Sequence, residues 1–281
     1  MEKHKIARLV TNEKQYDKYG AKVYEKIDKL FNQFVNKVHK KQKFEFIVTP
    51  GGFLSFPFSD ELSKDLPLLD FEVKFLEAII TEAEDFIEDF LSGLPDNVVD
   101  KIVEIGDFLT LGVDGYNSVN NQTIELVGVL DLKQKIMTLW TGKFYPTEGQ
   151  KETLIKVNDL DSHFIELNDQ KVAILGCHDL NVFSPRGQAN VNADSFKGIV
   201  SAEFRNKIIE YQPDIIIQHP HTTDTSKIWS PAWKEIEREL PSVKHYASGI
   251  KYYNPDGEPR GTLESVLEKT KKGDVVDFYF G

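Results

Sequence analysis

The side chains that could carry out chemistry gather in one short segment, Cys177-His178-Asp179. Cys177 is the only cysteine in the sequence. It follows Gly176 and an apolar run over 172–175 that is typical of a strand buried on both faces. Chemistry in open α/β architectures collects just past the carboxyl ends of strands. A thiolate there can attack a carbonyl or nitrile carbon if a neighbour lowers its pKa or takes its proton. We therefore expect Cys177 to mark an active-site position; the structural alternative is a small buried apolar group.

Two further histidines follow another buried-looking strand, predicted over 214–218. The strands that end at Gly176 and Gln218 should be neighbours in one sheet, so a histidine from this loop can come near Cys177. An imidazole titrates close to neutral pH and can take a thiol proton. The candidates for this role are His178, His219 and His221. The structural alternative for the His219-Pro220-His221 loop is a rigid strand exit whose imidazoles bond to backbone carbonyls.

The same loops also offer imidazole and carboxylate ligands of the kind that metal ions bind. The candidate ligands for this metal alternative are His178, Asp179, His219, His221 and Asp224. The structural alternative is that Asp179 has a structural role, as a cap or in a pair. Our prediction is that the protein has no metal site and no cofactor.

Periodic patterns predict the elements that position these loops. Strands over 6–10 and 44–48 flank a helix over 15–42, which gives a right-handed parallel β-α-β unit. Asp70 is the predicted N-cap of a second helix, which ends at Leu91. Residues 53–58 are expected to form an apolar loop and 59–67 a surface segment. The later elements are strands over 108–113, 123–132, 135–141, 171–175 and 214–218, a helix over 195–211 with Ile199 facing inward, a helix over 231–240, a strand over 243–253, a helix over 263–271 and a strand over 275–279.

Composition sets limits on the class of protein. The chain has 281 residues, of which 40% are hydrophobic and 28% are charged, as in ordinary globular proteins. No linker divides it, so we expect one domain over 1–281. The net charge of −11 argues against nucleic-acid and anionic-membrane partners. A single cysteine cannot form an internal disulfide, residues 1–12 lack the apolar core of a signal peptide, and no apolar run could span a bilayer. These features predict a cytoplasmic protein.

The order of these elements and the residues they carry resemble the nitrilase or carbon–nitrogen hydrolase superfamily over nearly the whole chain. The matching segments are Phe-Ile-Val-Thr-Pro at 46–50, Lys-Phe-Tyr-Pro at 143–146, Val-Ala-Ile-Leu-Gly-Cys-His-Asp-Leu at 172–180 and Pro-Asp-Ile-Ile-Ile-Gln-His-Pro at 213–220. The resemblance implies an α/β fold, the four-layer α-β-β-α sandwich. It also implies a homodimer, a small-molecule substrate, and a glutamate–lysine–cysteine triad that acts on amides and nitriles.

The resemblance assigns two of the three triad positions. Cys177 falls on the nucleophile, with His178 where an aromatic residue is usual. Lys143 falls on the lysine, which would stabilise the thiolate and then the oxyanion. The glutamate is expected directly after the proline that ends the second strand, but here Pro50 is followed by Gly51. A general base contributes roughly two to four powers of ten in rate, which glycine cannot supply.

Other residues could take over the role of the missing glutamate. A histidine near Cys177 would give a cysteine–histidine pair, and Glu148 lies in a loop where some family members place a second glutamate. Phe53, His221 and Trp229 are expected to bind substrate. The predicted function is thiol-dependent hydrolysis of an amide or nitrile carbon–nitrogen bond. The alternatives are an inactive binding or scaffold protein on this fold, and a metal-dependent hydrolase.

Overall fold

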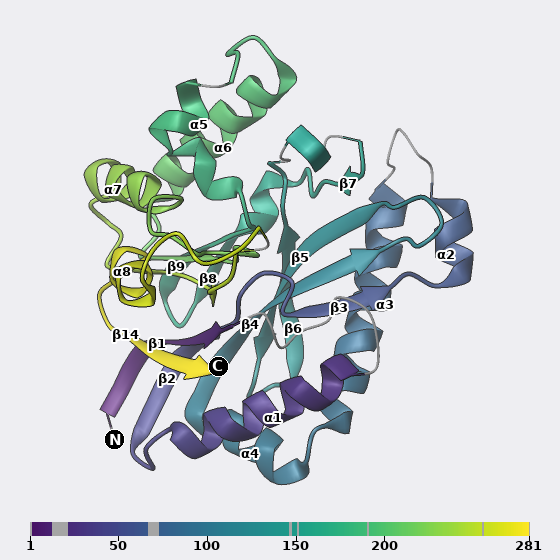
Figure 1. Cartoon of the computed structure of the whole chain (residues 1–281), viewed down its shortest axis with the longest axis vertical. Helices are drawn as coiled ribbons and strands as arrows, with labels where there is room; N and C mark the ends of the chain where they lie inside the picture. Colours follow the sequence, from purple (N-terminus) through teal and green to yellow (C-terminus); the bar gives the residue numbers. More distant parts are fainter. Residues whose placement is uncertain are drawn as a thin grey trace.

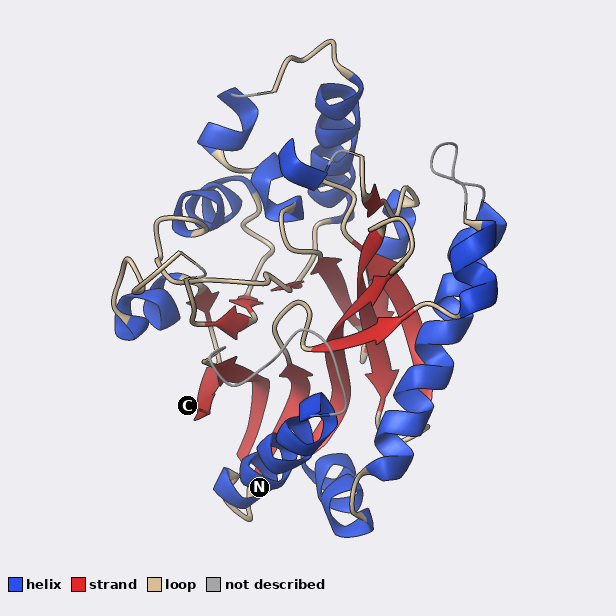
Figure 2. Ribbon diagram, turned by 45° about the vertical axis from the view of Figure 1, so that its right-hand side comes forward, coloured by secondary structure: helices blue, strands red, loops and turns tan. Residues whose placement is uncertain are grey.

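The chain forms two β-sheets that pack face to face, with helices covering the outer side of each sheet (Figure 1). The structure is a computed structural model, and it describes residues 2–12, 22–66, 73–145, 148–150, 152–189, 191–254 and 256–280. Figure 2 shows strands in the centre and helices outside them. The architecture is therefore the four-layer α-β-β-α sandwich that the sequence predicts.

The first sheet is built from the two ends and the middle of the chain. Its main path runs β12 (Ile250–Lys251), β1 (Glu2–Thr11), β2 (Gln42–Val48), β4 (Gly106–Tyr116), β5 (Thr123–Asp131) and β6 (Ile136–Gly142), while β14 (Val275–Phe280) pairs with β1, β3 (Leu54–Pro57) with β4, and β7 (Leu154–Ile155) with β5. The β1 and β2 strands are parallel, which confirms the predicted opening unit. The antiparallel register of β4 and β5 sets Asp114 directly opposite Glu125.

The second sheet carries the two loops in which the reactive residues were predicted. Its order is β13 (Lys271–Lys272), β11 (His245–Ser248), β10 (Ile215–Gln218), β9 (Gln170–Leu175) and β8 (Phe164–Leu167). The β9 and β10 strands pair in parallel, with Leu175 opposite Gln218. The prediction that these strands are neighbours is thus confirmed, and the loops after them leave the same edge of the sheet.

Apolar side chains on both faces of each sheet hold the layers together. Between the sheets, Phe46 and Val127 of the first pack with Ile174 and Ile217 of the second. The helices that cover the first sheet are α1 (Lys22–Lys37), α3 (Val73–Gly93) and α4 (Asp96–Ile105), and those over the second are α6 (Phe196–Tyr211) and α7 (Ser230–Glu239). Three shorter helices are α2 (Asp60–Asp65), α5 (Pro185–Ala189) and α8 (Leu263–Lys269), and 3₁₀ turns occur at η2 (Glu148–Gln150), η3 (Leu160–His163) and η4 (Asp179–Val182).

Several sequence-based expectations were wrong in detail. The predicted apolar loop over 53–58 contains β3, and neither α2 nor α4 was predicted. The predicted strand over 243–253 splits into β11 and β12, which lie in different sheets. It crosses at Gly249, where a Cβ would lie 2.4 Å from the Thr49 carbonyl oxygen, so the two sheets approach closely there.

Other expectations concern the surface and the assembly. Ile199 of α6 does not face inward, because 58% of it is exposed. The predicted N-cap Asp70 and the first residues of the predicted helix over 15–42 lie outside the described residues. Across the described ranges, no helix combines the length and the apolar character that crossing a membrane needs. The single domain, the homodimer and the cytoplasmic location stay predictions.

Candidate active site

Cys177 lies directly after β9, in a loop that hydrogen bonds fix from two sides. Its carbonyl oxygen accepts a 2.8 Å bond from Gln218 Nε2 at the end of β10. The thiol is buried, with 5% of the residue exposed. The sulfur accepts a hydrogen bond from the backbone N–H of His221, at 3.3 Å. The parallel pairing of β9 and β10 therefore brings the predicted histidine loop to the predicted nucleophile.

Asp179 is fully buried and ties two loops together. Its Oδ2 accepts from the N–H of Gly176 at 2.9 Å, and its Oδ1 accepts from the N–H groups of Phe144 and Tyr145 at 3.2 and 3.0 Å. Burial raises the pKa of this carboxyl to about 7, against the lowering effect of those N–H groups and of Lys143. Asp179 thus holds the loop of Cys177 against the loop that follows Lys143, as the structural alternative for this residue predicted.

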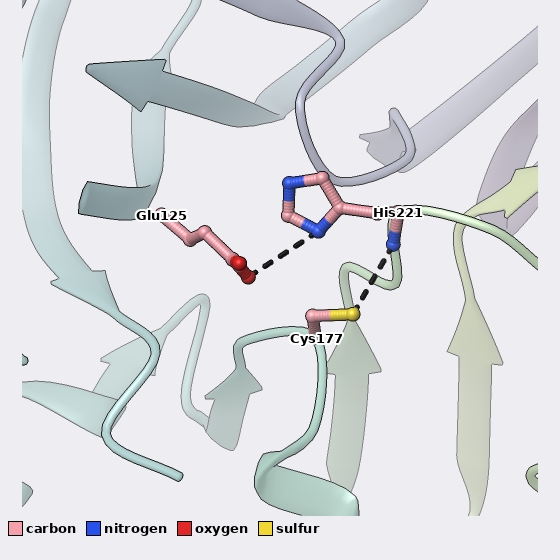
Figure 3. A group of neighbouring side chains, drawn as sticks. All are labelled: Glu125, Cys177 and His221. Atoms are coloured by element: carbon pink, nitrogen blue, oxygen red, sulfur yellow. Dashed lines mark hydrogen bonds and ion pairs between the residues drawn. The ribbon is translucent and has the colours of Figure 1, made fainter. Parts of the chain in front are cut away.

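The imidazole of His221 lies between two carboxylates and next to the thiol. Its Nε2 is 2.9 Å from both carboxylate oxygens of Asp114, and its Nδ1 is 3.3 Å from Glu125 Oε2. Figure 3 shows Glu125 and His221 pointing toward one another, with the sulfur of Cys177 beside them. About a quarter of the His221 side chain is exposed, at 25%. These contacts make His221, of the predicted histidines, the one that bridges the thiol to acidic groups.

The position of His221 also explains a cross-strand pair that would otherwise be unfavourable. Asp114 and Glu125 are directly opposite each other on β4 and β5, and like charges at such positions repel. An imidazolium between them relieves this repulsion. Burial lowers the pKa of His221, but Asp114 and then Glu125 raise it, and the net result is well above the ordinary value. The geometry thus favours a charged imidazole.

The surroundings of Cys177 favour the thiolate. Burial raises the pKa of the thiol, but His178 and His221 lower it further, so the pKa falls from 9.0 to about 5. The backbone N–H of His221 adds a donor that stabilises a charged sulfur. A thiolate beside an imidazolium is the arrangement that activates a cysteine nucleophile.

Lys143 is buried and binds Glu125. Its Nζ lies 2.9 Å from Glu125 Oε1 and 2.6 Å from Gln150 Oε1, and Gln150 Nε2 donates to the same Glu125 oxygen at 2.7 Å. Burial raises the pKa of Glu125, but His221 and then Lys143 lower it to about 2. Glu125 is therefore ionised. Direct stabilisation of the thiolate by Lys143 stays a prediction.

The Gly51-Gly52 turn explains why no glutamate stands after Pro50. A Cβ on Gly51 would lie 2.4 Å from the His219 carbonyl oxygen and 3.1 Å from His221 Nδ1. A Cβ on Gly52, where φ is +56°, would lie 2.6 Å from Asp114 Oδ2. The space that a side chain at position 51 would need is therefore taken by the backbone of the histidine loop and by the His221 ring.

The remaining predicted residues relate to this group in different ways. His178 lowers the pKa of the Cys177 thiol, and its ring contacts Trp229 edge-on at 5.5 Å between centroids. Trp229 is buried, with 1% exposed, and Phe53 packs in the core against Phe31 at 5.9 Å between ring centroids. Substrate binding by either residue stays a prediction. The Glu148 side chain lies outside the described residues.

His219 and the predicted metal ligands have other surroundings. His219 is buried, and burial lowers its pKa to about 3, so its ring stays neutral. The five ligands of the metal alternative do not form one group. Asp179 binds backbone N–H groups, and Asp224 forms a two-point ion pair with Arg260 at 2.7 and 2.8 Å.

Sequence reasoning missed three residues of the site, namely Asp114, Glu125 and Gln150. One signal was available for Glu125, which lies in an apolar strand between Ile124 and Leu126. A buried acid in such a strand needs a charged partner. No comparable pattern marks Gln150, whose place depends on the turn at η2.

Comparisons with known proteins bear on the fold. No family model and no curated protein matches the chain. Among solved structures, a carbon–nitrogen hydrolase from Helicobacter pylori G27 aligns over 95% of this chain and 78% of its own, with a TM-score of 0.50 and 12% identity. An amidase from Nesterenkonia sp. aligns over 88% and 76%, with a TM-score of 0.49 and 9% identity.

A third match is a much longer protein. Glutamine-dependent NAD+ synthetase from Acinetobacter baumannii aligns with 80% of this chain, with a TM-score of 0.41 and 15% identity, and the chain spans 34% of that protein's length. At such identities a likeness establishes the fold alone. The chain has the α/β nitrilase-like fold, the four-layer sandwich of the carbon–nitrogen hydrolase superfamily.

Proposed function

We propose that the chain is a thiol-dependent hydrolase that splits an amide or nitrile carbon–nitrogen bond, with Cys177 as nucleophile and His221 in place of the missing glutamate. The observation that carries the proposal is the position of His221. Its ring lies beside Gly51, its backbone N–H donates to the Cys177 sulfur, and Asp114 holds its Nε2. His221, in the loop after β10, would then act as the general base, a role that the family gives to a glutamate after β2.

The contacts support a complete reaction for an amide. The thiolate attacks the carbonyl carbon, and the π electrons move to oxygen. As the tetrahedral intermediate collapses, the carbon–nitrogen bond breaks and the His221 imidazolium gives its Nδ1 proton to the leaving amine, which leaves a thioester. Neutral His221 then takes a proton from water, and the resulting hydroxide attacks the thioester. Release of the carboxylic acid restores the thiolate and the imidazolium.

The acidic neighbours have supporting roles in this proposal. Asp114 fixes the ring orientation and keeps the second nitrogen of His221 facing the thiol, as the acid does in other nucleophile–histidine–acid sites. Glu125 is ionised, so it stabilises the imidazolium and does not act as the base. Lys143 holds Glu125 in place and is a positioning residue here.

The first test is the reactivity of the only thiol in the chain. Intact-mass spectrometry follows alkylation by iodoacetamide in the presence of EDTA. We expect the wild-type protein at about pH 6 to react faster than a free model thiol, which is almost entirely protonated there. His221→Asn should raise the pKa of the thiol and lower the rate roughly tenfold. The fall in the thiolate fraction outweighs the gain in nucleophilicity of the more basic thiolate. The exposed His39→Asn is the matched control and should react like wild type.

Turnover is tested on a panel of small amides and nitriles by release of ammonia or amine. Cys177→Ser should lose activity, and His221→Asn should lose roughly two to four powers of ten. Slow alkylation of wild type together with no turnover would instead favour the inactive binding protein on the same fold.

A further inference from the structure

Three metal-binding side chains converge from three elements of the fold. Glu125 comes from β5, Cys177 follows β9 and His221 follows β10, and one ligand atom from each lies within 4.8 Å of the other two. Figure 3 shows the Glu125 carboxylate and the His221 ring facing each other, with the Cys177 sulfur close to the backbone of His221. Over the described ranges, no other group of three histidine, cysteine or acidic side chains meets this condition.

Two of the three ligand atoms lack hydrogen bonds. Glu125 Oε2 and His221 Nδ1 are both buried, and neither has a hydrogen-bond partner. Glu125 as a whole is 8% exposed. These two atoms face each other as an ion pair at 3.3 Å, a distance longer than an ordinary hydrogen bond. Buried polar atoms are nearly always hydrogen-bonded, and a metal ion between these two would ligate both.

The outer atoms of the same side chains are already occupied. Asp114 binds Nε2 of His221, while Lys143 and Gln150 bind Oε1 of Glu125. A histidine that ligates a metal almost always has its other nitrogen bonded to a carboxylate or carbonyl, and ligating carboxylates are themselves hydrogen-bonded. The inward atoms, Glu125 Oε2 and His221 Nδ1, are thus pre-oriented toward each other.

We propose that Glu125 Oε2, Cys177 Sγ and His221 Nδ1 form a zinc site. In a tetrahedral site with zinc-to-nitrogen and zinc-to-oxygen bonds of about 2.0–2.1 Å, the two donors lie about 3.3–3.4 Å apart, and these atoms are 3.3 Å apart. The sulfur lies within 4.8 Å of both atoms and would have to move closer to complete the site. Zinc would replace the Nδ1 proton of the imidazolium, and its fourth position would stay open for water.

Zinc binding goes beyond the proposed hydrolysis and does not depend on it. Where the proposed function holds, the two exclude each other, because one sulfur cannot both ligate zinc and attack a carbonyl. Zinc would then be a reversible inhibitor that chelation removes.

Cobalt(II) is the spectroscopic probe for the site. Titration of the full-length protein with Co²⁺ at about pH 7 should give one equivalent with a thiolate-to-cobalt charge-transfer band and tetrahedral d–d bands, and Zn²⁺ should displace both. Cys177→Ser should remove the charge-transfer band. Glu125→Gln should weaken binding at least tenfold, and Asp114→Asn about 10–100-fold, as for loss of a supporting carboxylate. The exposed Glu152→Gln and His39→Asn are matched controls and should bind like wild type.

The outcomes separate this proposal from the proposed hydrolase. A thiolate–cobalt band, together with no turnover of any amide or nitrile by the EDTA-treated protein, supports the zinc site and rejects the hydrolase. Fast alkylation of Cys177 without a cobalt band rejects the zinc site but not the hydrolase. The zinc site is also rejected if Glu125→Gln and Asp114→Asn both bind Co²⁺ as tightly as wild type. Circular dichroism of each variant checks folding. Alkylation of wild-type Cys177 gives an independent readout, because Zn²⁺ should slow it and EDTA should restore it.

Discussion

The His221 ring lies where a side chain at position 51 would have to begin, with 3.1 Å between its Nδ1 and a Cβ built on Gly51. The two positions belong to different sheets, because Gly51 follows β2 and His221 follows β10. A base at either position would serve the same sulfur. A side chain at position 51 and the histidine loop in its present position therefore exclude each other.

Gly51→Ala tests this exclusion. The added Cβ meets the His219 carbonyl oxygen at 2.4 Å, and a backbone group cannot swing aside as a flexible side chain can. We expect a loss of about 1–3 kcal/mol in the free energy of unfolding, as for other overpacked sites. Urea denaturation measures it. Gly93→Ala is the matched control, because nothing lies within 4 Å of a Cβ there, and it should not destabilise. Equal stability of both variants would contradict the steric account.

The sequence was sufficient for the parts of the fold that repeat a simple pattern. Continuous apolar runs identified β9 and β10, and three- and four-residue spacing identified α1 and α3. It was insufficient at Gly249, where tertiary contact divides one apolar run between two sheets. Helix α6 shows the same limit, because Ile199 fits the helical period yet stays exposed.

The site was predictable only where the residues adjoin in sequence. Cys177, His178 and the histidine loop follow buried strands, and parallel pairing of these strands brings the loops together. Glu125 depends on the antiparallel register of β4 and β5, which a single sequence does not specify. The burial of Phe53 and Trp229 was not predictable, because an aromatic beside a site and an aromatic in the core have the same local pattern.

The pH dependence of Cys177 alkylation follows from its lowered pKa. The thiolate is present above the pKa, which the two neighbouring histidines bring to about 5. In EDTA the rate for wild type should be flat from about pH 8 to about pH 6 and should fall only as the pH drops through about 5. In His221→Asn the fall should begin at higher pH. A wild-type rate that rises throughout this range, as for an ordinary thiol, would count against the ion pair.

Asp114→Asn tests the positioning of His221. The amide keeps the shape of the side chain but removes the charge that raises the pKa of His221 most among its neighbours. The alkylation profile of Cys177 should therefore move to higher pH while the plateau rate changes little, a split that general destabilisation does not produce. Asp100→Asn, at an exposed position on α4, is the control and should leave the profile in place. An unchanged profile in both variants would remove Asp114 from the mechanism.

His163 should make the stability of the whole fold depend on pH. It is fully buried between the sheet and α6, with Nδ1 2.7 Å from the Ile174 carbonyl oxygen and its ring 4.6 Å from that of Phe204. Burial lowers its pKa from 6.5 to about 4. Between these values the unfolded chain binds a proton that the folded chain does not, so stability is complete above about pH 6.5 and is lost as the pH falls toward about 4.

The contribution of His163 can be isolated by comparison with a variant. Its pKa shift corresponds to roughly 3 kcal/mol, so the difference in the free energy of unfolding between wild type and His163→Asn should shrink by about that amount from pH 7 to pH 4. Urea denaturation at a series of pH values measures the difference. For the control His39→Asn, the plot of unfolding free energy against pH should run parallel to that of wild type, because His39 is exposed in the folded protein. If the His163→Asn curve also stays parallel, the buried imidazole is not the group that acid must charge to unfold the protein.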